Sequence, residues 1–340
     1  MKVAVVGASG AVGREMTRIL EERGFPADEF LPLASARSAG RTVRFRGADH
    51  AIRELSVEAL RGTDVALVSA GATVSRAFIP QAAANGTTCI DNSSAFRMDP
   101  AVPLVVPDVN PEALAGEPKI VSVPNCTTIT AVLPLGPLHR AAGLVDLSLS
   151  SYQSVSGAGH RGVAEMIEQI DKLHGHEDEF ARMDPSSFPS GPVFGKTIAF
   201  NVLAKVGNFE PGGYTGEEAK MMAEPRKILG LPDLPVVATS VRVPVPVGHA
   251  VTIIARFSRA ITPDEAREIL ARAPGVDIRD DPANGIYPSP LEAAGGDTAL
   301  VGRIRQVEHD PNALVFFSCA DNLRQGAALD AVLIAEHLFT

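Results

Sequence analysis

The feature that most constrains the fold of this chain is a glycine-rich turn that begins at residue 7. Four apolar residues, Val3–Val6, come immediately before it, and three glycines follow at three-residue spacing: Gly7, Gly10 and Gly13. Glycine permits a tight turn and a close approach of another molecule to the backbone, and a helix N-terminus offers unpaired N–H groups and a positive dipole end. The pattern predicts a strand, a phosphate-binding turn and a helix in direct succession.

The first half of the chain continues this alternation of short apolar runs with helical patterns. Because its strands are apolar throughout, both faces of their sheet are expected to be covered, which is typical of parallel βαβ units. Right-handed crossovers then predict an α/β, Rossmann-like, doubly wound nucleotide-binding domain. The expected strands are Lys2–Val6, Phe30–Ala34, Asp64–Ser69 and Thr87–Asn92, and the expected helices are Val12–Glu22 and Ser75–Ala84.

The pattern changes after about Pro124. Alternating runs now follow one another with few helices between them, which favours an α+β domain whose mostly antiparallel sheet packs one face on helices. Proline and glycine cluster at Met183–Gly195, the expected excursion or subunit-contacting arm, and Asp321–Phe339 is expected to be helical. The alternating runs are Val145–Val155, Val236–Val243, Ala250–Phe257, Ala299–Arg305 and Ala313–Cys319.

The glycine turn and the end of the second expected strand together indicate the cofactor. Ser9 stands where the common GxGxxG motif has its second glycine, so a turn without a ligand is the alternative; its place between strand and helix favours binding. An NAD enzyme would carry an acid about 20 residues further on, whereas this chain has Arg37 and Ser38, which suit a ribose 2′-phosphate. We expect NADP(H), held by Gly7, Ser9, Gly10, Ala11, Val12, Gly13, Arg37 and Ser38.

Charge and composition exclude several classes of protein. The 31 Lys and Arg residues against 40 Asp and Glu residues give a formal net charge of −9, which argues against nucleic acid as the main partner. No apolar run approaches the roughly 18 residues of a membrane-spanning helix, and the start lacks a secretory apolar region. Three scattered cysteines are too few for a disulfide framework or a zinc site, so we expect a cytoplasmic protein without a metal.

Cys126 is the cysteine whose surroundings favour chemistry. It follows Val123-Pro124-Asn125 at the start of an apolar helical run, where the helix dipole favours the thiolate and lowers the thiol pKa. Cys89 and Cys319 lie inside apolar strand patterns, where a buried, inert thiol is expected. The sequence predicts that Cys126 is a nucleophile.

Six motifs, in one order along essentially the whole chain, resemble those of the aspartate-β-semialdehyde dehydrogenase family. Each motif alone is weak to moderate, whereas the ordered set is highly specific. They are the N-terminal glycine turn, Pro124–Thr128, Gln153 before Ser156–Gly159, Glu217-x-x-Lys220, Arg242 seven residues before His249, and Asp321–Ala328.

The resemblance implies reversible, NADPH-dependent reductive dephosphorylation of L-aspartyl 4-phosphate to L-aspartate 4-semialdehyde, a step toward lysine, threonine, methionine and diaminopimelate. It implies that Cys126 forms a thioester and that His249 is the general acid and base, a role that an imidazole pKa near the working pH suits. His160 is the rival histidine. Gln153 would orient the substrate through its amide.

Binding roles follow from the same resemblance. Arg242 would hold the substrate α-carboxylate by a bidentate fork, and the Pro/Gly break before His249 would let both side chains turn into one pocket. The phosphate or phosphoryl group would contact Arg97 and Lys220. Glu217 shares a helical face with Lys220, although Glu218 leaves that register open by one residue. The cofactor would also lie against Ser156, Gly157 and Asn322.

The resemblance also sets expectations for the whole molecule. Residues 1–125, completed by the C-terminal helix 321–340, would bind NADP, and residues 126–320 would form the catalytic and dimerisation domain of a homodimer or a homotetramer. Its partners would be small molecules, neither nucleic acid nor membrane. Three alternatives are an N-acetyl-γ-glutamyl-phosphate reductase, a glyceraldehyde-3-phosphate dehydrogenase, which normally carries the ribose-binding acid absent here, and a non-catalytic NADP-binding paralogue, which would be expected to lose its nucleophile.

Overall fold

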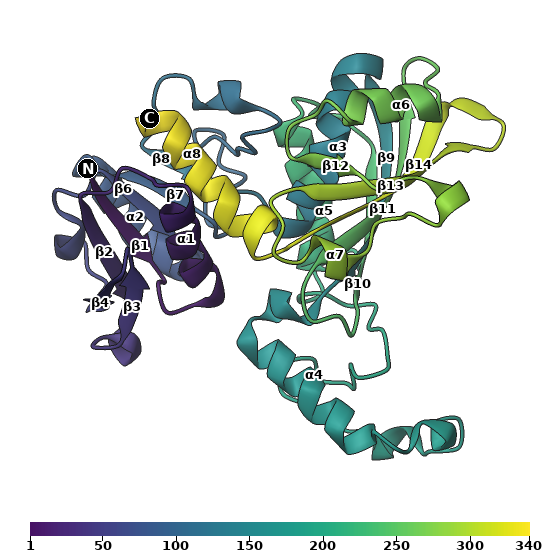
Figure 1. Cartoon of the computed structure of the whole chain (residues 1–340), viewed down its shortest axis with the longest axis horizontal. Coiled ribbons are helices and arrows are strands. Elements are labelled where there is room, and N and C mark those ends of the chain that lie inside the picture. The colour runs from purple at the N-terminus through teal and green to yellow at the C-terminus, as the bar shows by residue number, and fades with distance from the viewer.

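A computed structural model describes all of residues 1–340 and shows two β-sheets side by side with an arm projecting from the second (Figure 1). The first sheet lies in the N-terminal part and the second in the C-terminal part. The arm contains α4 (His160–Leu173) and the extended segment that follows it. No helix of the structure has the length and hydropathy needed to cross a membrane.

The first sheet is parallel throughout, as the apolar strands predict. Its strand order is β5-β2-β1-β6-β7-β8. Successive strands are added on one side of β1 up to β5 and on its other side from β6 onward, as in a doubly wound sheet. Its elements are β1 (Lys2–Val6), α1 (Ala11–Glu22), β2 (Glu29–Ala34), β5 (Arg53–Glu54), β6 (Val65–Val68), α2 (Ala72–Ala84), β7 (Thr88–Asp91) and β8 (Ile120–Ser122), with a separate hairpin of β3 (Thr42–Phe45) and β4 (Ala48–Ala51).

Both faces of the first sheet are buried, and β1 shows why its sequence is continuously apolar. Val3 and Val5 belong to one core with α1 and α8 (Leu329–Phe339), while Ala4 and Val6 belong to the core that contains α2. Alternate side chains of a strand point to opposite faces, so a strand covered on both sides needs no polar positions. This packing fixes the end of β1, and with it the glycine turn.

The second sheet is mixed. Its order is β10-β9-β11-β14-β13-β12; the three central pairings are antiparallel, as predicted, and the two edge strands β10 and β12 each run parallel to their neighbour. Its strands are β9 (Leu144–Gln153), β10 (Val236–Arg242), β11 (His249–Phe257), β12 (Val276–Ile278), β13 (Ala299–Val307) and β14 (Asp310–Ala320).

Three helices cover one face of the second sheet, whereas the other, which we call the open face, carries only a short helix near Ala293. The covering helices are α3 (Cys126–Ala142), α5 (Gly216–Ile228) and α6 (Pro263–Leu270), which share a core with alternate residues of β9 and β11. The open face carries partly exposed apolar side chains, among them Tyr152, Val237 and Ile254. One short helix and seven single turns complete the chain: α7 (Pro290–Ala293), η1 (Ala36–Ser38), η2 (Glu58–Leu60), η3 (Pro111–Leu114), η4 (Val155–Ala158), η5 (Glu177–Glu179), η6 (Pro185–Ser187) and η7 (Pro282–Asn284).

The C-terminal segment returns to the first sheet. After β14 the chain forms a single π-helical turn, η8 (Arg324–Ala328), and then α8, which packs against α1 and lies beside it in Figure 1. Arg324 pairs with Glu15 and Glu22 of α1. These contacts support our proposal that residues 1–125 and 321–340 form one unit and residues 126–320 the other.

Candidate active site

The glycine turn has the geometry that a bound dinucleotide requires. Gly7 adopts a φ of 90°, and a Cβ on it would lie 2.2 Å from the carbonyl oxygen of Ser69; a Cβ on Gly13 would lie 2.2 Å from the carbonyl oxygen of Gly7. Side chains are therefore excluded at both positions. No side chain caps the N-terminus of α1, and its first turn carries no acid. The free N–H groups and the positive dipole end fit a pyrophosphate.

The segment after β2 lies against the glycine turn and completes the predicted cofactor site. Ser9 in the turn donates a hydrogen bond to the hydroxyl of Ser38 over 3.1 Å, which brings the segment against the turn. Arg37, in η1, is exposed and has no carboxylate partner. A hydroxyl and a free guanidinium beside the turn fit the 2′-phosphate of NADP.

A pocket of about 280 Å³ joins the glycine turn to the predicted nucleophile. Gly10 and Val12 line it from α1, Cys126 from α3 and Arg97 from the loop after β7. Ser156, Gly157 and Asn322 line it as well, so most of the predicted cofactor contacts and the thiol share one space.

Cys126 is the first residue of α3, and Asn125 is the N-cap. The side-chain oxygen of Asn125 accepts hydrogen bonds from the backbone N–H groups of Thr127 and Thr128 over 2.9 and 3.3 Å. The prediction that the thiol pKa is lowered is wrong for the protein without ligand: burial, with the carboxylate of Glu217, raises the pKa of Cys126 to about 11. The helix N-terminus and nearby arginines do not offset the loss of hydration.

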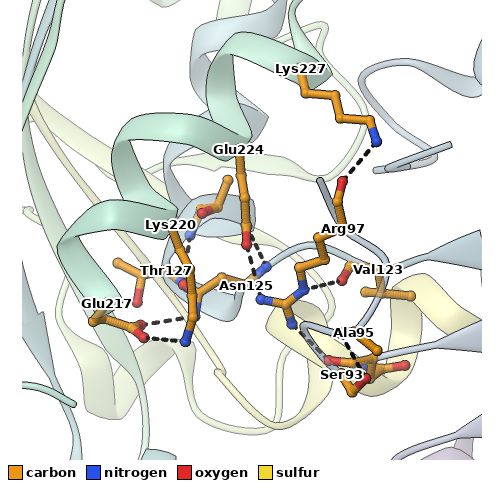
Figure 2. A network of polar contacts seen from close by, with 12 residues as sticks. Ser93, Ala95, Arg97, Val123, Asn125, Thr127, Glu217, Lys220, Glu224 and Lys227 are labelled. Atoms are coloured by element: carbon orange, nitrogen blue, oxygen red, sulfur yellow. Dashed lines mark hydrogen bonds and ion pairs between the residues drawn. The ribbon is translucent and has the colours of Figure 1, made fainter. Parts of the chain in front are cut away.

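Glu217 connects Gln153 to Asn125, the residue before the predicted nucleophile. One of its carboxylate oxygens accepts from Asn125 Nδ2 over 2.9 Å, and the other lies 3.2 Å from Lys220 Nζ (Figure 2). The first oxygen also accepts from Gln153 Nε2 over 3.1 Å. Burial acts to raise the pKa of Glu217, but Lys220 and these hydrogen bonds together hold it below its ordinary value. Glu218 instead closes a capping box with Thr215, which resolves the register in favour of Glu217.

Arg242 and His249 converge, as the Pro/Gly break predicts. Each ends or begins a strand, on either side of β9, and a Cβ on Gly157 would lie 2.9 Å from Arg242 Nη1 and 3.1 Å from His249 Cε1. Arg242 Nη1 donates to the carbonyl oxygen of Ser154 over 2.6 Å. His160, in contrast, is exposed at the start of α4.

His249 is fully buried and held through one ring nitrogen. Its Nδ1 accepts from the backbone N–H of Ser154 over 3.1 Å, and Nε2 is buried without a partner. A backbone N–H can only donate, so the neutral ring carries its proton on Nε2. Burial, with the charge of Arg242, lowers the pKa of His249 to about 3, so the expected pKa near the working pH is wrong for this buried ring.

Arg97 is more tightly held than a solvated binding arginine. Its Nε donates to the carbonyl oxygen of Val123 over 2.9 Å, its Nη2 to that of Asn92 over 2.7 Å, and its Nη1 to Glu224 over 3.0 Å. Five N–H groups less three leaves two donors for an anion in the pocket. Figure 2 shows Arg97 between Glu224 and the loop after β7.

The side chain of Asn322 binds protein groups around His249. Its Oδ1 accepts from the backbone N–H of Gly248 over 2.9 Å and from the hydroxyls of Ser154 and Ser156 over 3.0 and 3.1 Å. The sequence predicted a cofactor contact here, and the position on the pocket wall is compatible with one.

Four residues with structural contacts in the site escaped the sequence analysis: Asn125, Ser154, Glu224 and Lys227. Glu224 and Lys227 continue the helical face of Glu217 and Lys220 at seven-residue spacing, which is the one signal in the sequence for them. Cys89 and Cys319 are buried, and burial raises the pKa of each thiol to about 12. The structure holds no cluster of three or more His, Cys, Asp or Glu side chains suited to a metal ion.

Comparisons with known proteins agree over the whole chain. Residues 2–117 match the family model "Semialdehyde dehydrogenase, NAD binding domain", and residues 135–325 match "Semialdehyde dehydrogenase, dimerisation domain". The aspartate-semialdehyde dehydrogenase of Corynebacterium glutamicum is 49% identical over 346 positions, which cover 99% of this chain and 98% of that protein.

Solved structures give the same result. Aspartate semialdehyde dehydrogenase II from Vibrio cholerae, complexed with ASA, superimposes with a TM-score of 0.90 at 39% identity, covering 99% of this chain and 97% of that one. The Candida albicans aspartate semialdehyde dehydrogenase with NADP has the same fold, with a TM-score of 0.74 at 24% identity over 99% of this chain and 98% of that one.

Proposed function

The chain belongs to the aspartate-semialdehyde dehydrogenase family, and on that premise we propose how its pocket converts L-aspartyl 4-phosphate reversibly to L-aspartate 4-semialdehyde. The protein is an NADP-dependent oxidoreductase. The observation that carries the proposal is the position of Cys126: it opens α3 in the same pocket as the uncapped N-terminus of α1. A nucleophile and a dinucleotide turn in one space are what acyl reduction through a thioester needs.

Cys126 is the proposed nucleophile. Its Sγ forms a bond to the acyl carbon, the bond from that carbon to the phosphate oxygen breaks, and the thiol proton leaves with the phosphate. NADPH, when bound, supplies the hydride that reduces the resulting thioester. Release of the aldehyde then breaks the bond between carbon and Sγ and leaves a thiolate, which takes one proton from solvent. Because the free thiol pKa is about 11, substrate binding has to favour the thiolate before attack.

His249 is the proposed hydrogen-bond donor to the acyl oxygen. Its Nε2–H faces Gly157 and has no other partner, so it is free to donate to the acyl oxygen as negative charge develops there. Ser154 supports this role because its N–H occupies Nδ1 and fixes the tautomer. The low pKa keeps the ring neutral at all working pH values, which favours hydrogen-bond donation over storage of a proton.

Arg242, Gln153 and Glu217 are the proposed substrate contacts. Gln153 and Arg242 are paired in the register of β9 and β10, so both side chains point to one side of the sheet. The guanidinium suits the α-carboxylate, and Glu217 supplies a buried negative charge for the α-amino group. Arg97 and Lys220 are the proposed phosphate contacts.

We also propose a homodimer formed through the open face of the second sheet. That face exposes Tyr152, Val237 and Ile254, apolar side chains that a partner subunit would cover, and the chain matches a dimerisation-domain model there. Sedimentation of the wild type and of Ile254→Arg tests this, since a buried charge would shift the protein toward the monomer.

A thiol nucleophile has to stay reduced, which favours a cytoplasmic location.

The deciding experiment is an NADP-linked assay with aspartate semialdehyde and inorganic phosphate, run beside the N-acetylglutamate semialdehyde analogue. We expect turnover with the first substrate, and faster reduction of NADP than of NAD. Turnover of the N-acetylated substrate alone would contradict the proposal, because an N-acetyl group removes the amine that Glu217 is proposed to hold. A burst of phosphate on mixing with the acyl phosphate would demonstrate the acyl-transfer step.

A further inference from the structure

Helix α5 turns a charged face, rather than an apolar one, toward the start of α3. Glu217, Lys220, Glu224 and Lys227 are spaced three, four and three residues apart, so they lie along one side of the helix. Figure 2 shows this side directed at Arg97 and Asn125. Glu217 and Lys220 have proposed roles in binding, whereas Glu224 and Lys227 have none.

Glu224 uses both of its carboxylate oxygens on groups next to the chemistry. Its side chain is 1% exposed. One oxygen accepts from Arg97 Nη1 over 3.0 Å, and the other accepts from the backbone N–H of Asn125, the residue before Cys126, over 2.7 Å. One buried carboxylate thus connects the guanidinium proposed for phosphate to the peptide that carries the thiol.

Lys227, one turn further along α5, binds the backbone of the loop that carries Arg97. Its Nζ donates to the backbone carbonyl oxygens of Arg97, Asp99 and Val102, each over 2.7 Å. The guanidinium of Arg97 is therefore held by Glu224 and its backbone by Lys227. Both contacts come from one rigid helix.

We propose that Glu224 is a positioning residue that sets the distance between the phosphate-binding guanidinium of Arg97 and the thiol of Cys126. The inference rests on the proposed phosphate role of Arg97. An acyl phosphate spans both groups at once, since its carbonyl carbon has to meet Sγ while its phosphoryl oxygens meet the guanidinium. Small displacements of such groups reduce rates strongly.

The chemistry of Glu224 requires two acceptors. Glutamine has nearly the same shape but only one acceptor oxygen, so its NH₂ group would face either Arg97 Nη1 or the Asn125 N–H, donor against donor. Aspartate keeps both acceptors on a chain shorter by one methylene group. The inference therefore orders the variants: Glu224→Gln is impaired more than Glu224→Asp.

The test is steady-state kinetics of the full-length enzyme in the direction of aldehyde oxidation, with inorganic phosphate varied. We expect Glu224→Gln to raise the KM for phosphate roughly 10- to 100-fold and to lower kcat, with the NADP dissociation constant unchanged. The matched control is Glu218→Gln on the same helix. Glu218 is buried and accepts backbone N–H groups of Thr215 and Ser240, without contact to Arg97 or Asn125.

The control separates positioning from helix stability. Both glutamine variants are expected to lower the melting temperature, but Glu218→Gln should leave the KM for phosphate within about twofold of the wild type. An equal rise in both variants would reduce Glu224 to a structural residue and overturn the inference. An unchanged phosphate KM in Glu224→Gln would overturn it as well.

Arg97→Lys distinguishes this failure from failure of the proposed function. Lysine keeps a positive charge beside Glu224 but cannot make the same set of hydrogen bonds. We expect it to raise the KM for phosphate, and Glu224→Gln to add less than about twofold to that rise in the double variant, because the carboxylate acts through the arginine. If Arg97→Lys leaves the phosphate KM unchanged, the phosphate role of Arg97 is wrong, and the inference falls with it. Full additivity would overturn the inference alone.

Discussion

The pocket lies between the start of α1 and the start of α3, and its two walls differ in whether backbone or side-chain groups form them. The wall at α1 consists of backbone: its turn admits no side chain at Gly7 or Gly13, and no side chain caps the helix. The wall at α3 is lined by Arg97 and Asn125, which are bound by two buried carboxylates of α5, Glu224 and Glu217. The first wall is therefore sensitive to side-chain volume, and the second to the position of single charges and protons.

The largest effect is expected at the thiol. Cys126→Ala should abolish turnover, since the bond to the acyl carbon cannot form, and should leave NADPH binding intact because the glycine turn belongs to the other wall. Cofactor fluorescence measures the binding. Cys319→Ala is the control, because that thiol is buried away from the pocket. Residual turnover above about a hundredth of the wild-type rate would require another nucleophile.

His249→Ala comes next, with an expected loss of roughly 10²- to 10⁴-fold in kcat, the usual scale for help by an acid or base. The NADP dissociation constant should stay the same. His160→Ala serves as the control and should retain full activity. If kcat fell strongly in the His160 variant and only slightly in the His249 variant, His160 rather than His249 would be the residue that assists the chemistry.

The reactivity of the thiol toward alkylation should depend on pH in a way that identifies its pKa. With a pKa of about 11, thiolate forms only at high pH, so the rate of iodoacetamide modification of Cys126 should rise about tenfold per pH unit from pH 7 to 10. Peptide mapping assigns the modified residue. A plateau near pH 7 would instead show that the helix N-terminus dominates over burial.

On the α1 side of the pocket, the charge of Arg37 is expected to affect NADP binding. Arg37→Ala should weaken NADP binding roughly 10- to 150-fold, as expected for the loss of a charged hydrogen bond to the 2′-phosphate. NAD lacks that phosphate and should bind as before. Isothermal titration with both cofactors measures this, and equal weakening of both would mean that the segment after β2 does not read the 2′-position.

The smallest effect is expected from adding a side chain to the glycine turn. A Cβ at Gly13 would lie 2.2 Å from the carbonyl oxygen of Gly7, so Gly13→Ala should destabilise the fold by about 1–3 kcal/mol and weaken both cofactors alike. Gly24→Ala, at the exposed end of α1 where a Cβ meets nothing within 4 Å, is a control for backbone strain alone. Denaturant unfolding gives both values. Unchanged stability of Gly13→Ala would remove the volume argument.

The sequence predicts the backbone wall well because its determinants are local. The glycine spacing, the apolar β1 and the helix that follows lie within one stretch of chain, and the structure reproduces them. The Pro/Gly break between Arg242 and His249 is also local, and the two side chains do converge. Cys126 at the start of α3 belongs to the same class.

The charged wall is predicted poorly because its determinants are distant in sequence. Glu224 bonds to groups 99 and 127 residues away, a pairing that no spacing rule reveals. The pKa values of Cys126 and His249 depend on how much water the whole fold removes, so the local helix N-terminus predicted the wrong direction for the thiol. Local motifs predict which groups react, whereas their protonation states depend on tertiary packing.

The return of α8 to the first sheet bears on how such a chain can change over generations. Recombination that exchanged residues 1–125 as one block would bring in a new sheet and leave behind the helix that packs on α1 and the Arg324 pairs to Glu15 and Glu22. The hybrid would have a mismatched core. An intact exchange of the nucleotide-binding unit would therefore have to carry residues 321–340 together with residues 1–125, two segments at opposite ends of the chain.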